Sequence, residues 1–82
     1  MRDIVEIFGK IVDLVPEESK VEFKNMLDWL KKTAPYTAPE IMGNLWWEVN
    51  DFLSENATKF DRNIVDKMIF IWNDKTERNL DF

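Results

Sequence analysis

The sequence predicts an all-α fold, a compact bundle of four or five short helices that forms one domain over residues 1–82. In four segments the apolar residues recur at intervals of three and four, which is the spacing of one helical face. Proline, asparagine and threonine residues separate these segments, and the connections are as short as those in helical bundles. A chain of 82 residues, 45% of them hydrophobic, is long enough for one small core.

The first helix is expected over residues 3–15. Asp3 suits its N-cap, and Pro16 ends it, because proline lacks an N–H group and clashes with the preceding helical turn. Its core-facing stripe consists of Ile4, Phe8, Ile11, Val12 and Val15.

The second helix is expected to start with Pro16 at its first position and to end near Thr33. Pro35 sets this end, because a proline disfavours helical geometry at the residue before it. Its apolar face consists of Phe23, Met26, Leu27 and Leu30, and Trp29 lies on the flank of that face.

The third helix has the clearest amphipathic pattern. Thr37 and Glu40 have the spacing of a capping box, so the helix is expected to begin there and to run to about Ser54. Its stripe consists of Ile41, Leu45, Val49 and Phe52, widened by Met42, Trp46 and Leu53. Leu45, Val49 and Phe52 lie at the centre of the stripe and are expected to be largely buried.

The fourth helix is expected to begin with Thr58 as its cap and Asp61 at its third position, and to continue to about residue 74. Phe60, Ile64, Val65, Met68, Ile71 and Trp72 share one face of it. A strand over residues 68–72 would have no second strand to pair with. The charged tail 75–82 is expected either to fray or to lie against the bundle.

The composition excludes many functions. The chain has no cysteine, no histidine and only two glycines, so it lacks a thiolate, the commonest metal ligand and a phosphate-binding loop. We therefore expect no enzyme activity, no cofactor and no metal site. A net charge of −5 disfavours direct binding to nucleic acid or to anionic membranes. No apolar run is long enough to span a membrane, and the N-terminus lacks the features of a signal peptide, so a cytoplasmic location is expected.

Acidic residues are concentrated on one side of the third helix. At about 100° per residue, its four carboxylates fall within a sector of about 80° opposite the apolar stripe, and Asn44 shares that sector. We call Glu40, Asn44, Glu48, Asp51 and Glu55 the acidic ribbon. No lysine or arginine occurs between Thr33 and Thr58. The ribbon is either an ordinary solvated face or a contact surface for a basic partner, including one that normally binds nucleic acid.

Two aromatic residues lie outside the apolar stripes. Trp47 is about 170° from the centre of the third stripe, beside the acidic ribbon, and Phe70 is about 160° from the centre of the fourth. Each is either an exposed contact residue or a second core residue on a helix that is buried on two sides.

The expected function is that of a non-enzymatic protein-binding module. It would be a small acidic inhibitor or regulator that occludes a basic surface of another protein, of the kind that phages and mobile elements carry. The expected partner-binding residues are Glu40, Asn44, Trp47, Glu48, Asp51 and Glu55. The alternative is a structural or self-associating subunit, a homodimer that forms through Trp47 and Phe70.

Overall fold

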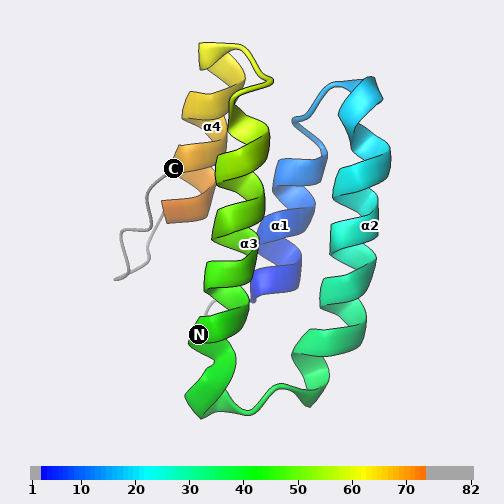
Figure 1. The fold of residues 1–82 in the computed structure, drawn as a ribbon, viewed down its shortest axis with the longest axis vertical. Helices are drawn as coiled ribbons and strands as arrows, with labels where there is room; N and C mark the ends of the chain where they lie inside the picture. The colour runs from blue at the N-terminus through cyan, green and yellow to red at the C-terminus, as the bar shows by residue number, and fades with distance from the viewer. Residues whose placement is uncertain (1–2, 74–82) are drawn as a thin grey trace.

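The computed structural model of the chain describes residues 3–73, which fold into a bundle of helices (Figure 1). The elements in order are α1 (Ile4–Val12), α2 (Glu17–Thr33), the 3₁₀ turns η1 (Ala34–Tyr36) and η2 (Pro39–Ile41), α3 (Met42–Ala57) and α4 (Arg62–Asn73). No strand occurs within residues 3–73, so the prediction of a small all-α bundle is confirmed. The predicted tail 75–82 lies outside the described residues.

Helix α1 packs against both α2 and α4, and α3 lies in front of it in the view of Figure 1. All five residues of its predicted stripe are buried. The predicted N-cap is also confirmed, because the Asp3 carboxylate accepts a hydrogen bond of 2.9 Å from the Val5 N–H. The first helix of the sequence is therefore the central element of the core.

Helix α1 ends at Val12, before the predicted end at residue 15. The Lys20 ammonium of α2 reaches this end and donates to the carbonyl oxygens of Val12, at 3.0 Å, and Asp13, at 3.5 Å. These contacts satisfy helix-terminal carbonyl groups and place a cation at the negative end of the helix dipole. Helix α2 thus helps to define where α1 stops.

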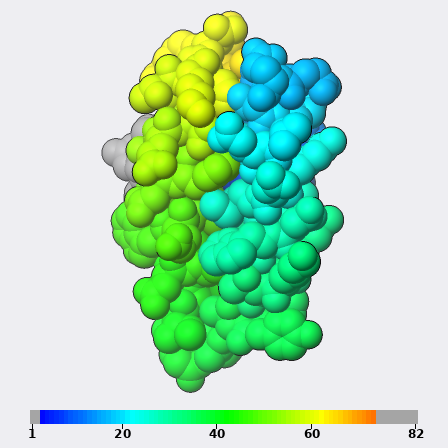
Figure 2. Space-filling view, turned by 45° about the vertical axis from the view of Figure 1, so that its right-hand side comes forward, coloured from blue at the N-terminus to red at the C-terminus, as the bar shows by residue number. Residues whose placement is uncertain are grey.

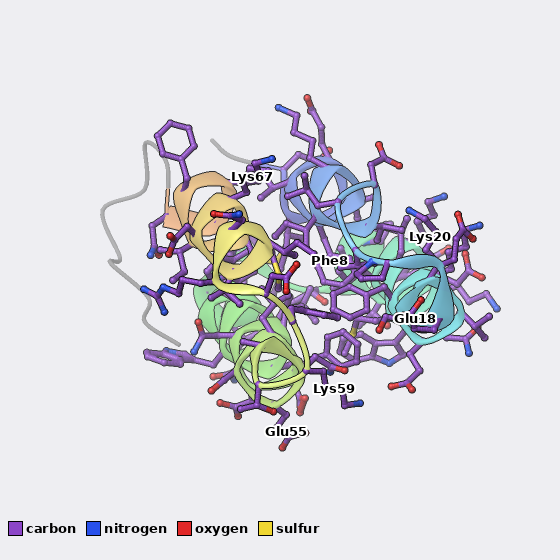
Figure 3. The ribbon with its side chains drawn as sticks, turned by 90° about the horizontal axis from the view of Figure 1, so that it is seen from above. Phe8, Glu18, Lys20, Glu55, Lys59 and Lys67 are labelled. Carbon is purple, nitrogen blue, oxygen red and sulfur yellow. The ribbon has the colours of Figure 1, made fainter. Side chains whose placement is uncertain are left out.

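Four phenylalanines from three helices and one turn form a cluster of ring contacts, in which Phe8 and Phe23 are fully buried and Phe52 and Phe60 are partly buried. Phe8 points from α1 into the space between the helices (Figure 3), where its ring stacks on that of Phe23 at 5.8 Å. The Phe52 ring of α3 lies 4.8 Å from that of Phe23 and 6.1 Å from that of Phe8, and the Phe60 ring lies 5.8 Å from that of Phe23. Helices α1, α2 and α3 are joined by these aromatic contacts.

The predicted burial of the α3 stripe is correct at two of its three central positions. Leu45 and Val49 are buried, whereas Phe52 is only partly buried. The ring of Phe52 contacts the core through Phe8 and Phe23 and also lines an open groove between α2 and α3.

Apart from the phenylalanine contacts, a buried pair of tryptophans joins α3 to α4. The rings of Trp46 and Trp72 lie 4.8 Å apart, and the Trp72 indole N–H donates to the Asn50 side-chain oxygen at 3.2 Å. Trp72 is fully buried, and Asn50 is 4% exposed. The contact of the two rings buries apolar area. The hydrogen bond pairs two polar groups inside the core and thereby favours one position of α4 along α3.

The predicted capping box at the start of the third helix is wrong. The Thr37 hydroxyl donates to the Thr33 carbonyl at 2.8 Å, and no side chain caps η2 or α3. Pro39 begins a 3₁₀ turn that precedes α3, so Glu40 and Ile41 lie outside the helix. Ile41 is consequently exposed and does not belong to the buried stripe.

The predicted cap and start of the fourth helix are also wrong. Helix α3 continues past Ser54 to Ala57, and Thr58 follows its end, where the hydroxyl donates to the Glu55 carbonyl at 3.2 Å. Helix α4 begins at Arg62, so Thr58 does not cap it. The buried side-chain amide of Asn56 donates to the Phe52 carbonyl at 2.8 Å, inside this last part of α3.

Candidate protein-binding surface

The acidic ribbon is exposed along its whole length. Asn44, Glu48, Asp51 and Glu55 lie on the exposed side of α3, at spacings of four, three and four residues that make them neighbours on one helical face. Figure 3 shows Glu55 on the outer side of α3. Glu40 is exposed too but lies in η2, so it precedes the helical face instead of sharing it. The structure therefore places three of the four carboxylates on α3 itself.

The ribbon carboxylates form no ion pair within residues 3–73. The two ion pairs of that region join Lys59 to Glu22, at 4.0 Å, and Arg62 to Asp66, at 2.9 Å. The ammonium of Lys59, the nearest basic residue after the ribbon in the sequence, contacts Glu22 and the Asn56 side-chain oxygen. Among the residues that the structure describes, the ribbon thus presents a row of like charges without cationic partners, and such a row attracts other cationic groups.

Trp47 is exposed beside this row, with 53% of its surface accessible to solvent. It lies one helical turn before Asp51 and one turn after Gly43. An indole this accessible is not a core residue, so of the two interpretations of Trp47 the structure supports the exposed one. Beside the carboxylates, the indole offers apolar surface of the kind that interface anchors provide.

Phe70 is 72% exposed, but on another part of the molecule. Trp72 faces α3 through its contact with Trp46. Because Phe70 precedes Trp72 by two residues, it lies about 160° round α4 and points away from α3. Phe70 therefore does not share one continuous surface with Trp47 and the acidic ribbon.

A groove of about 400 Å³ separates α2 from α3 and opens to solvent (Figure 2, between the cyan and the green helix). It is lined by Glu22, Asn25, Met26, Trp29, Glu48 and Phe52. Glu48 belongs to both the acidic ribbon and the groove, so the two features form one surface. Sequence reasoning placed Trp29 on the flank of its helix but missed the groove, because the groove exists only where α2 pairs with α3.

The described part of the chain offers this surface few kinds of chemistry. Within residues 3–73, no three acidic side chains come close enough together to hold a metal ion. No helix in the same region has the length and hydropathy needed to cross a membrane. What the surface presents is carboxylate oxygens beside aromatic rings, a combination suited to cationic groups.

Comparisons of the chain with protein-family models, with curated proteins and with solved structures give no match.

Proposed function

We propose that this protein is a non-enzymatic binding module whose acidic ribbon recognises a basic surface of another protein. One observation carries this proposal: Glu48, Asp51 and Glu55 form an exposed row on α3 without an ion pair in residues 3–73. An ordinary solvated helix intersperses charges of both signs, because opposite charges four residues apart stabilise it. The row lacks such pairs within the described residues, and a partner with a cationic surface would supply the opposite charges on binding.

The row of carboxylates and Trp47 have different roles in this proposal. The carboxylates attract a cationic surface over distances of about 10 Å at moderate ionic strength, so they act mainly on the rate of association. Trp47 provides apolar area that is removed from water on contact, so it acts mainly on the rate of dissociation. A partner covered in this way would lose access to its own anionic ligands, including nucleic acid, and the protein would thereby act as an inhibitor or regulator.

Affinity capture from the cells that produce the protein, followed by mass spectrometry, identifies the partner. The wild-type chain is compared with Asp51→Lys/Glu55→Lys and with the control Glu17→Lys/Asp28→Lys, which makes the same charge change at exposed positions of α2. We expect basic proteins that the wild type and the control retain and the ribbon variant loses. Equal capture by all three chains would contradict the proposal.

Charge reversal at Asp51 and Glu55 is expected to slow association with that partner at least about tenfold at low salt, and much less at high salt. The physical reason is that both positions are exposed and act on the encounter through a screened field. Surface plasmon resonance over a series of salt concentrations measures the effect. The melting temperature should stay within a few degrees of the wild type, since surface substitutions usually change stability by at most about 0.5 kcal/mol. An association rate that does not depend on salt in the wild type would contradict the role of the ribbon.

A further inference from the structure

The groove between α2 and α3 has an apolar floor and a charged rim. Met26 and Phe52 are partly buried against the core, and Trp29 exposes 41% of its surface. Glu22 from α2 and Glu48 from α3 are both exposed, one from each wall. The groove is therefore shaped for a side chain that has an apolar stem and a cationic end.

Its volume of about 400 Å³ is sufficient for a side chain. The groove also adjoins the acidic ribbon. Going round α3, Glu48 lies about 40° from Phe52 and about 100° from Trp47. The ribbon thus lies between the groove on one side and Trp47 on the other, so a partner bound to the ribbon would have side chains within reach of the groove.

A cation of the chain itself already lies at this rim. The Lys59 ammonium is 4.0 Å from the Glu22 carboxylate, with both side chains more than half exposed. Such an exposed pair contributes at most about 1 kcal/mol, so a cation from a partner can replace it. Glu22 is therefore accessible to a positive group at the rim of the groove.

We propose that this groove binds an arginine side chain of the basic partner; the proposal rests on the function proposed above and names one contact within it. Arginine fits better than lysine, because the planar guanidinium stacks on an indole face and donates to carboxylates in a fork. Trp29 supplies the indole, Glu22 and Glu48 supply the carboxylates, and Met26 and Phe52 contact the aliphatic stem.

Nona-arginine and nona-lysine peptides test this proposal, because they carry the same charge and differ in the cationic group. Fluorescence anisotropy of the labelled peptides at low salt measures the affinities. NMR spectra of the ¹⁵N-labelled protein follow the indole N–H signal of Trp29. We expect nona-arginine to shift that signal and to bind about three- to fivefold more tightly than nona-lysine.

Variants show whether this preference arises in the groove. Trp29→Leu should abolish it, Trp29→Phe should keep part of it, and Tyr36→Leu, which removes an aromatic ring exposed elsewhere, should leave it unchanged. Lys59→Met, which removes the competing cation of the chain, should strengthen the binding of nona-arginine. Circular dichroism measures whether each variant keeps its helices.

The results separate the groove from the ribbon. Asp51→Lys/Glu55→Lys should weaken the binding of both peptides and leave their ratio unchanged. Equal affinities of the wild type for the two peptides, or an unchanged ratio in Trp29→Leu, would overturn the arginine site while the ribbon remained supported. If the wild type preferred nona-arginine but Asp51→Lys/Glu55→Lys bound both peptides as tightly as the wild type, the proposed function of the ribbon would be overturned instead. Failure of the wild type to bind either peptide would overturn both.

Discussion

Replacing Trp72 by alanine is expected to lower the free energy of unfolding by about 3–5 kcal/mol, the usual range for a large aromatic residue in a core. Trp72 is fully buried, its ring lies 4.8 Å from that of Trp46, and its indole N–H donates to Asn50. The substitution removes all these contacts between α3 and α4 at once. A domain of this size has a total stability of only about 5–10 kcal/mol, so much of it would be lost.

Thermal and urea unfolding followed by circular dichroism measure this change. Trp72→Phe keeps most of the apolar contact and removes the hydrogen bond to Asn50, so it should have a smaller effect than alanine. Phe70→Ala is the matched control on the same helix, because Phe70 is exposed and should contribute at most about 0.5 kcal/mol. If Trp72→Ala melted within a few degrees of the wild type, α4 would not pack on α3 as described.

Trp47→Ala is expected to have the opposite profile, with little change in stability and a large loss of binding. The side chain is 53% exposed, so its removal leaves no cavity in the core. If it anchors the partner, binding should weaken by about 2 kcal/mol or more, which corresponds to about thirtyfold, mainly through faster dissociation. Surface plasmon resonance with the captured partner measures both rates.

Phe70→Ala serves as the control here too, because it removes a more exposed aromatic residue that points away from the ribbon. It should leave both rates unchanged. A loss of stability in Trp47→Ala as large as that in Trp72→Ala would show that the indole supports the core. Light scattering measures the mass of both chains in solution. A dimer mass for the wild type and a monomer mass for Trp47→Ala would point to self-association in place of a heterologous partner.

The existence of the helices could be predicted from the sequence, because each presents an apolar stripe of period 3.6 to the same core. The prediction was most complete for the start and the apolar stripe of the first helix, where Asp3 caps α1 and every stripe residue is buried. Such features depend on neighbours in the chain, so a local pattern is enough to find them. The exposure of Trp47 and Phe70 depends on how the other helices pack, and the sequence left it open.

The errors of prediction occur where local signals compete or where two helices meet. Thr37 and Thr58 both suit an N-cap, but each hydroxyl donates to a carbonyl of the preceding helix or turn instead. Pro39 places Glu40 in a 3₁₀ turn, which removes it from the face of α3. The groove has lining residues from both α2 and α3, so no single helical pattern contains it.

The central claim is that the exposed face of α3 is the partner-binding surface. Amide hydrogen exchange of the ¹⁵N-labelled protein, alone and saturated with the captured partner, tests it most directly. We expect added protection along α3 from Asn44 to Glu55, together with a shifted indole N–H signal for Trp47, and a loss of both as salt is raised. Protection confined to α1 and the outer face of α4, with the amides of α3 and the Trp47 indole unchanged, would contradict the claim.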